Sequence, residues 1–160
     1  MSVRSGIGFD SHRLAAGRPL VVGGVHLPGA ERGLAGHSDA DVLTHAVMDA
    51  LLGAAGMGDI GQRYSDTDER WRDSDSIALL RDVCHSLGVH GLSITHVDAT
   101  VICEAPKLDP WRDAMRSRLA ETMDLTPLEV NVKFTTNEGM GALGRGEGIA
   151  ALAVATLESA

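Results

Sequence analysis

The stretch from residue 37 to residue 56, HSDADVLTHAVMDALLGAAG, predicts the most clearly patterned helix of the chain. Ser38 followed by Asp41 is typical of a capping box, and acidic residues here favour the positive end of a helix. We therefore expect a helix over about 39–55 with one apolar face. The apolar positions with the helical period of 3.6 residues are Leu43, Ala46, Val47, Ala50 and Leu51.

One histidine of this helix stands among acidic residues. His45 shares a helix face with Asp41 and Asp49, four residues before and after it. Since the apolar stripe lies on the opposite side, we expect His45 to stay out of the deep core. Pairing with Asp49 is the simpler interpretation of this face, and metal ligation is the other.

Upstream, the sequence GFDSHR at 8–13 places Asp10 and His12 two residues apart, just after a strand expected over 3–9. Alternation along a strand puts both side chains on one face. They are either ordinary polar residues at a strand end or two metal ligands. Joined by His45 they would offer one oxygen and two nitrogen donors with one position left open, as catalytic zinc requires. A short D-x-H pattern alone is a weak signal.

The remaining pattern completes an α+β fold. Strands are expected at 3–9, 20–27, 92–103 and 130–136. Helices are expected at 39–55, 73–88 (with Gly88 just past the end) and 109–123. The segments 29–36, 56–70 and the glycine-dense 137–148 are expected to be loops. The apolar run 148–158 fits a buried strand or a helix, and periodicity does not choose. We expect one domain, 1–160, with a sheet covered by helices on one face.

Composition limits the classes of partner. The net charge of −8 disfavours nucleic acid, and no apolar run reaches the length of a membrane span. Two cysteines, Cys84 and Cys103, build neither a disulfide scaffold nor a cysteine-rich zinc site. The N-terminus lacks the apolar centre of a secretory signal, so we expect a cytoplasmic protein.

Several loops could receive an anion. His37 and Ser38 stand at a helix N-terminus, and glycines around Asp59 permit close approach of backbone to a ligand. Thr135–Glu138 ends a strand, and Arg145 lies in GRGEG, where its guanidinium could grip an oxyanion. Each has a structural alternative: capping by Ser38, a tight turn, an Asx turn, and surface pairing of Arg145 with Glu147. From residues alone the interpretation stops at metal-dependent phosphate chemistry.

The order of the motifs adds a resemblance. GFDSHRL, HSDADVLTHAVMDALLGAAGMGDIG, SDTD, EAPK, KFTTNE and GRGEG follow one another along the chain. In this order they resemble the 2-C-methyl-D-erythritol 2,4-cyclodiphosphate synthases of the non-mevalonate isoprenoid pathway, over essentially the whole length. The resemblance implies a lyase that converts 4-diphosphocytidyl-2-C-methyl-D-erythritol 2-phosphate to the 2,4-cyclodiphosphate and CMP. It further implies a mixed sheet and a chorismate-mutase-like homotrimer around a threefold axis, with active sites between subunits.

The resemblance also implies roles for individual residues. The Zn²⁺ ligands would be Asp10, His12 and His45, with Asp49 behind a ligand histidine. Glu138 would hold a second cation, Mg²⁺ or Mn²⁺, and His37 and Thr136 would stabilise the transition state. The expected substrate contacts are Ser38, Asp59, Ile60, Gly61, Tyr64, Asp66, Lys107, Thr135, Asn137, Glu138, Ala142 and Arg145. Residues 103–109 and Thr135 would form the cytidine pocket, and Tyr64 and Asp66 belong to a mobile loop.

Two positions depart from the family pattern. Ala142, three residues before Arg145, stands where the family often has an aromatic residue. Arg145 itself matches a family residue near the mouth of an axial cavity that can hold isoprenoid diphosphates. Tyr64 stands where Phe is frequent. Two other classes of function stay open: a metal-dependent phosphohydrolase using the same ligands, and a noncatalytic trimeric module in which zinc joins strand to helix.

Overall fold

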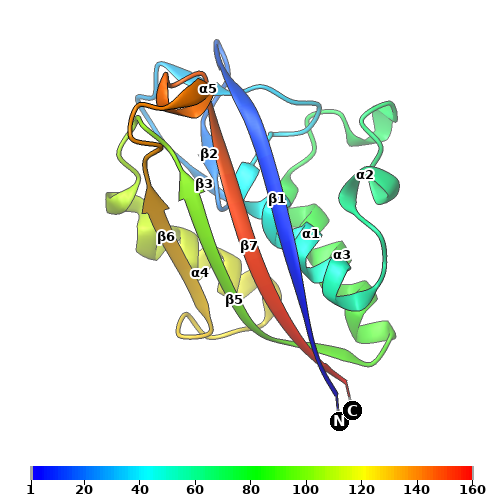
Figure 1. Cartoon of the computed structure of the whole chain (residues 1–160). Coiled ribbons are helices and arrows are strands. Elements are labelled where there is room, and N and C mark those ends of the chain that lie inside the picture. The colour runs from blue at the N-terminus through cyan, green and yellow to red at the C-terminus, as the bar shows by residue number, and fades with distance from the viewer. Residues whose placement is uncertain (1, 160) are drawn as a thin grey trace.

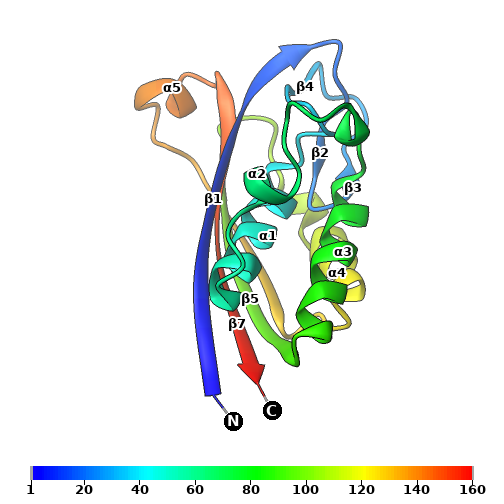
Figure 2. The same ribbon diagram turned by 90° about the vertical axis from the view of Figure 1, so that its right-hand side faces the viewer.

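The computed structural model describes residues 2–159 as a sheet with helices on one face (Figures 1 and 2). The sheet has five strands in the order β4-β1-β7-β5-β6. They are β1 (Ser2–Ala16), β4 (Arg32–Leu34), β5 (Leu92–Ile102), β6 (Val130–Thr135) and β7 (Gly148–Ser159). Strands β5 and β6 run parallel and the other pairs antiparallel. The mixed sheet and one-sided helical layer confirm the α+β prediction.

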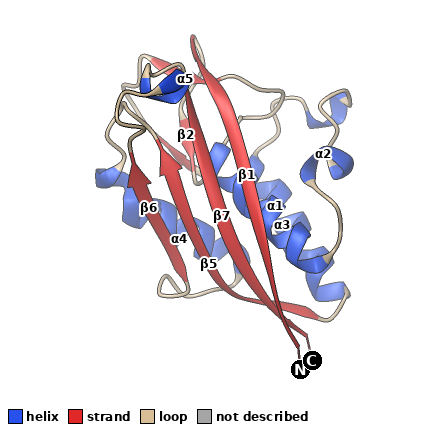
Figure 3. Ribbon diagram, viewed as in Figure 1, coloured by secondary structure: helices blue, strands red, loops and turns tan. Residues whose placement is uncertain are grey.

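Three long helices form the second layer, as Figures 2 and 3 show. They are α1 (Val42–Ala55), α3 (Ser76–Val89) and α4 (Arg112–Met123). The shorter elements are α2 (Ile60–Arg63), α5 (Gly141–Gly144), the 3₁₀ turns η1 (Glu69–Trp71) and η2 (Asp109–Trp111), and the hairpin β2 (Val21–Val22) with β3 (Val25–His26). Within residues 2–159, no helix is both long and apolar enough to span a bilayer.

Helix α1 lies unusually close to β1, because two glycines of the strand face it. A Cβ at Gly8 would come within 1.9 Å of the Ala46 carbonyl oxygen, and one at Gly6 within 2.2 Å of the Ala50 carbonyl oxygen. Small residues on both elements let the backbones approach. The close approach brings the side chains of α1 within reach of those that follow Gly8 on the same face of β1.

The N-terminus of α1 differs from the capping box expected at Ser38. Asp41 is the N-cap, and its buried carboxylate accepts hydrogen bonds from the backbone N–H and hydroxyl of Thr44 at 3.0 and 2.7 Å. The same carboxylate accepts from the N–H groups of Gly23 and Gly24, at 2.8 and 2.6 Å. Asp41 therefore ties the β2–β3 turn to the helix, and α1 begins at Val42 instead of 39.

Other boundaries also differ from expectation. The strand expected over 3–9 extends to Ala16, because β7 pairs with it along nearly its whole length and satisfies its backbone groups. The single strand expected over 20–27 is a hairpin that turns at Gly23 and Gly24. The loop expected over 29–36 contains β4, which is too short to show alternation.

The last apolar run is strand β7, which settles the choice that periodicity left open. Gly88 does not end α3: the helix continues to Val89, and Gly91 adopts the left-handed conformation at φ +70° instead. The glycine-dense loop contains the single turn α5.

The face of the sheet away from α1 is apolar in its middle. Phe9 of β1 pairs with Leu152 of β7, and Ile7 with Val154. These side chains and that of Val3 are exposed, Ile7 to 69% and Phe9 to 57%. Helix α5 lies at one end of this face (Figure 2).

Candidate active site

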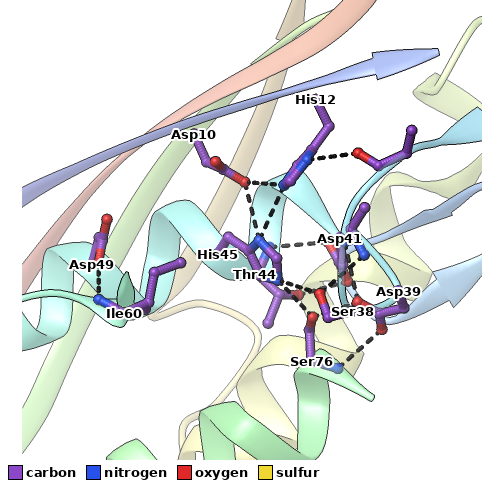
Figure 4. A network of polar contacts seen from close by, with 12 residues as sticks. Asp10, His12, Ser38, Asp39, Asp41, Thr44, His45, Asp49, Ile60 and Ser76 are labelled. Carbon is purple, nitrogen blue, oxygen red and sulfur yellow. Dashed lines mark hydrogen bonds and ion pairs between the residues drawn. The ribbon is translucent and has the colours of Figure 1, made fainter. Parts of the chain in front are cut away.

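Three side chains from β1 and α1 converge on one point. Oδ2 of Asp10 lies 2.8 Å from Nε2 of His12 and 3.1 Å from Nδ1 of His45. The two histidine nitrogens are 3.3 Å apart. Figure 4 shows all three groups turned toward one another across the gap between strand and helix. Asp10 and His12 share a strand face as predicted, but in the middle of the strand and not at its end.

The donor set fits a divalent metal ion. Zinc bonds of about 2.0–2.1 Å in a tetrahedron place neighbouring donors roughly 3.3–3.4 Å apart. The three donor atoms here lie 2.8, 3.1 and 3.3 Å from one another, close to that spacing. Within residues 2–159 three donor atoms converge here, so a fourth position around a metal ion would remain for a ligand oxygen.

The far nitrogen of each histidine is also engaged. Nδ1 of His12 lies 3.0 Å from the carbonyl oxygen of Ala35, to which its N–H can donate. Nε2 of His45 lies 2.8 Å from Oγ of Ser76 and 3.3 Å from Oγ of Ser38. Such partners fix which ring nitrogen faces a metal.

The contacts among Asp10, His12 and His45 shift the pKa values of Asp10 and His45. Burial alone would raise the pKa of Asp10, but hydrogen bonds and positive charge from His12 and His45 hold it well below its usual range. Burial would likewise lower the pKa of His45, yet the hydrogen bond and charge of Asp10 raise it overall. The carboxylate is therefore ionised across the physiological range, as a metal ligand must be.

Two expectations around α1 were wrong. His45 is buried, only 7% exposed, because α1 lies so close to β1 that its polar face is covered. Asp49 pairs with neither ligand histidine in the structure: its Oδ1 accepts a hydrogen bond from the backbone N–H of Ile60 at 2.8 Å. Asp49 thus holds the start of α2 against α1 (Figure 4).

A cavity of about 370 Å³ opens beside the three donors. Its lining residues are Asp10, His12, Gly36, His37, Ser38, His45, Met48, Ile60, Gly61, Tyr64, Asp66, Trp71 and Leu79. The metal-ligand candidates and most of the expected substrate contacts before residue 70 therefore meet in one place. Asp59 does not line it; as N-cap of α2 its side chain accepts from Gln62 N at 2.8 Å.

Four lining residues were not expected from the sequence: Gly36, Met48, Trp71 and Leu79. Trp71 was open to detection, because aromatic residues are scarce and this one falls next to the loop expected over 56–70. It stacks edge-on against Tyr64, with ring centroids 5.1 Å apart. Met48 and Leu79 are apolar residues within the expected helices, and nothing in the sequence pattern marked them as cavity-lining.

A smaller cavity, about 80 Å³, lies at the ends of β5 and β6. It is lined by Cys103, Pro106, Lys107, Leu108, Asp109, Phe134, Thr135 and Thr136. The structure thus brings together most of the residues expected around a cytidine, and Thr136 with them; Glu104 and Ala105 do not line this cavity. Strand β7 lies between β5 and β1, the strand that carries Asp10 and His12.

Four expected substrate contacts line neither of these two cavities: Asn137, Glu138, Ala142 and Arg145. The backbone N–H of Asn137 donates to Glu104, and Glu138 has a positive φ of 51°. Ala142 lies in α5, and Nε of Arg145 donates to Glu147 at 2.7 Å, the surface pairing considered above. The structure of one chain does not bring Glu138 to the metal-ligand candidates.

Fold and site together define an α+β protein in which one aspartate and two histidines are arranged as donors that fit a divalent metal ion, beside a cavity. The chain belongs to the YgbB family, whose model matches residues 3–158. A relative from Synechococcus sp. (strain JA-2-3B'a(2-13)), named 2-C-methyl-D-erythritol 2,4-cyclodiphosphate synthase, is 54% identical over 97% of this chain and 98% of its own length. One of the same name from Burkholderia mallei (strain SAVP1) is 56% identical, over 97% of this chain and 95% of its own.

Solved structures agree with the fold. The bifunctional IspDF from Campylobacter jejuni matches with a TM-score of 0.95 and 40% identity over 99% of this chain, which spans 43% of that longer protein. A 2C-methyl-D-erythritol-2,4-cyclodiphosphate synthase in a CDP-bound form matches with a TM-score of 0.88 and 38% identity, over 97% of this chain and all of its own.

Proposed function

We propose that this chain is a cyclodiphosphate synthase, a lyase that converts 4-diphosphocytidyl-2-C-methyl-D-erythritol 2-phosphate to 2-C-methyl-D-erythritol 2,4-cyclodiphosphate and CMP. The observation that carries the proposal is the convergence of Asp10, His12 and His45 beside a cavity, in a chain more than half identical to synthases of that name. All 160 residues would act as one domain.

The reaction asks for positioning more than for a protein nucleophile. The 2-phosphate of the substrate attacks the β-phosphorus of its own diphosphate, so the attacking group is already tethered. Phosphoryl transfer is mostly orientation and neutralisation of charge, and good orientation can lower a barrier by roughly 7–11 kcal/mol. Residues that fold the substrate back on itself therefore matter most.

Asp10, His12 and His45 would hold Zn²⁺, with Ala35 and Ser76 orienting the two histidines. When bound, this cation and a second one near Glu138, Mg²⁺ or Mn²⁺, supply positive charge that draws electrons from the β-phosphorus. Nε2 of His37 lies 3.0 Å from the carbonyl oxygen of Asp68, which holds the imidazole at the cavity wall. Its other nitrogen is left to meet a phosphate oxygen.

The cavity beside the donors suits the methylerythritol portion. Ser38, Ile60 and Gly61 line it, and Tyr64 and Asp66 close it from the loop. Asp59, at the start of α2, would accept hydrogen bonds from substrate hydroxyls after a small turn of its carboxylate. The apolar share of the wall excludes water, which protects the tethered phosphate from competition by hydrolysis.

The second cavity suits the cytidine. Lys107 supplies a cation and Thr135 and Thr136 supply hydroxyls there. The CDP-bound form of a solved relative, and a Plasmodium falciparum IspF described as a CDP complex, support a nucleotide diphosphate ligand.

We further infer a chorismate-mutase-like homotrimer. The exposed apolar side chains on β1 and β7 are a surface that a monomer would leave to water. The first cavity lies beside β1 and the second at the ends of β5 and β6, with β7 between these strands. A site that needs both would combine the cavity of one subunit with that of a neighbour. In such a trimer Asn137 and Glu138 would reach the neighbour's phosphates. Ala142 and Arg145 would stand near an axial cavity that could take an isoprenoid diphosphate.

One assay tests the proposed reaction. The purified chain is incubated with the diphosphocytidyl substrate, Zn²⁺ and Mg²⁺, and followed by phosphorus NMR. Cyclic diphosphate with CMP is the expected outcome. Linear phosphates would instead indicate a metal-dependent phosphohydrolase, and the absence of turnover a noncatalytic module; either result overturns the proposal.

A further inference from the structure

The side of His45 that faces away from Asp10 leads into a buried chain of polar contacts. Nε2 of His45 lies 2.8 Å from Oγ of Ser76, the first residue of α3. The hydroxyl of Ser76 donates in turn to Oδ1 of Asp39. Figure 4 shows Ser76 and Asp39 on the side of His45 that faces away from Asp10 and His12.

The direction of this chain is set by the aspartate. Oδ2 of Asp39 accepts from the backbone N–H of Ser76 at 2.9 Å, and Oδ1 accepts from the backbone N–H of Asp41 at 3.1 Å. A carboxylate in this position only accepts, so the single hydroxyl proton of Ser76 points at Asp39. The lone pairs of Ser76 are then left for His45, whose Nε2 must carry the hydrogen.

That arrangement decides which nitrogen of His45 can bind a metal. A neutral imidazole with its hydrogen on Nε2 has its lone pair on Nδ1, the atom 3.1 Å from Asp10 and 3.3 Å from His12. Water is a poor substitute for Ser76, because the serine is fully buried and His45 is 7% exposed. Ser38 is the alternative partner of Nε2, but it lies farther, at 3.3 Å, and also accepts from Ala40 N.

We propose that Ser76 and Asp39 are positioning residues that hold His45 in the tautomer whose Nδ1 faces Asp10 and His12. The inference rests on the metal centre of the proposed function, and it adds α3 to that centre. Two aspartates fix the start of α3. Asp39 places Ser76 against His45, and Asp75 caps the helix by accepting a hydrogen bond from Ile77 N at 2.9 Å.

The test measures zinc binding without substrate, so its outcome is separate from that of the activity assay. Metal-free chain is titrated with Zn²⁺ against a chromophoric chelator. In Ser76→Ala the dissociation constant should rise about 10- to 100-fold, the usual effect of losing a partner of a ligand histidine. Asp39→Asn should weaken binding in the same direction. The matched control is Asp75→Ala, which removes the cap of the same helix end and should leave the zinc dissociation constant unchanged.

A second readout follows the imidazole itself. In ¹⁵N-histidine-labelled, zinc-bound protein, NMR should show the Nε2–H of His45 with the downfield proton shift of a hydrogen-bonded N–H in the wild type. In Ser76→Ala and the double variant Ser38→Ala/Ser76→Ala this proton should move upfield and exchange faster with water. The proposal is overturned if zinc affinity and the Nε2–H signal of His45 both match the wild type in Ser76→Ala, Asp39→Asn and the double variant. It is likewise overturned if Asp75→Ala weakens zinc as much as Ser76→Ala.

Discussion

The hydroxyl of Tyr64 lies 2.5 Å from Oδ2 of Asp82, and this contact joins the cavity loop to the middle of α3. Arg63 reaches the same oxygen with Nε and Nη2, at 3.1 and 2.9 Å. The Tyr64 hydrogen bond, followed by that of Arg63, lowers the pKa of Asp82. The ring of Tyr64 is thereby held upright against Trp71 as a wall of the cavity.

Removing only that hydroxyl should loosen the wall. Tyr64→Phe keeps the ring and loses a hydrogen bond to a charged group, worth about 1.5 kcal/mol or more at a buried site and less here because Asp82 is half exposed. We expect KM for the diphosphocytidyl substrate to rise by up to about tenfold with kcat little changed. Steady-state kinetics measure this. An unchanged KM together with a lowered kcat would contradict a role in holding the wall.

The close approach of α1 to β1 makes a second prediction. Gly8→Ala would place a methyl group 1.9 Å from the Ala46 carbonyl oxygen, a backbone atom that cannot turn away. We expect the free energy of unfolding to fall by about 3 kcal/mol or more, since overpacking of this kind displaces backbone. Urea denaturation of the metal-free chain gives the value.

The control for Gly8→Ala lies on the facing helix. A Cβ at Gly53 would meet nothing nearer than the Ile7 carbonyl oxygen at 3.8 Å. Gly53→Ala should therefore stabilise the chain by roughly 0.5–1 kcal/mol through helix propensity. If both variants behaved alike, the close approach of the two elements would not be the cause.

The local patterns that predicted α1, α3, α4 and the strands depend on short-range periodicity, and these elements exist. What the sequence could not show is how near two elements lie. The spacing of Asp41, His45 and Asp49 suggested a helix face outside the deep core, but Gly6 and Gly8 allow β1 to cover it. His45 is buried because of a contact between residues far apart in sequence. Helical periodicity is a local pattern and cannot reveal such a contact.

The sequence predicted the three metal-ligand candidates of the site, but not the residues that hold them in place. Asp10 and His12 share a strand face by simple alternation, and His45 completes the set. No sequence pattern pointed to Ser76, because its role depends on its contact with His45, which only the folded chain creates. Asp49 misled for the opposite reason: its spacing on the helix was right, but α2 folds back and takes its carboxylate.

Zinc should stabilise the native chain through its three donors. A ligand at a hundredfold excess over its dissociation constant adds about 2.7 kcal/mol to the free energy of unfolding. We expect the Tm of chelator-treated protein to rise on addition of Zn²⁺, and this rise to vanish in His12→Ala. His85→Ala removes an exposed histidine of α3 and serves as control. Calorimetry with and without metal measures the difference; a rise that survives in His12→Ala would place the zinc elsewhere.

Alkaline pH should reduce the stability of the fold through a partly buried thiol, that of Cys84. Burial raises the pKa of Cys84 from its ordinary 9.0 to about 12, so the folded state holds this proton more tightly than the unfolded state. The corresponding stability is fully present below pH 9.0 and is lost as pH rises toward about 12. Urea denaturation at increasing pH should show a steeper alkaline loss in the wild type than in Cys84→Ala. Equal slopes in the two proteins would exclude the thiol as the cause.

The exposed apolar face of the sheet should be the surface on which subunits meet. Phe9 is 57% exposed and pairs with Leu152 across β1 and β7. In the proposed trimer a charge at this position would be buried without a partner. We expect Phe9→Glu to shift the chain from trimer to monomer in sedimentation velocity and to abolish turnover, because the cytidine cavity of a neighbour would be lost. Zinc binding should persist, since all three donors belong to one chain. Leu128→Glu, at a site 88% exposed on the turn between α4 and β6, should leave mass and activity unchanged. A Phe9→Glu monomer with full activity would show that one subunit holds a whole site.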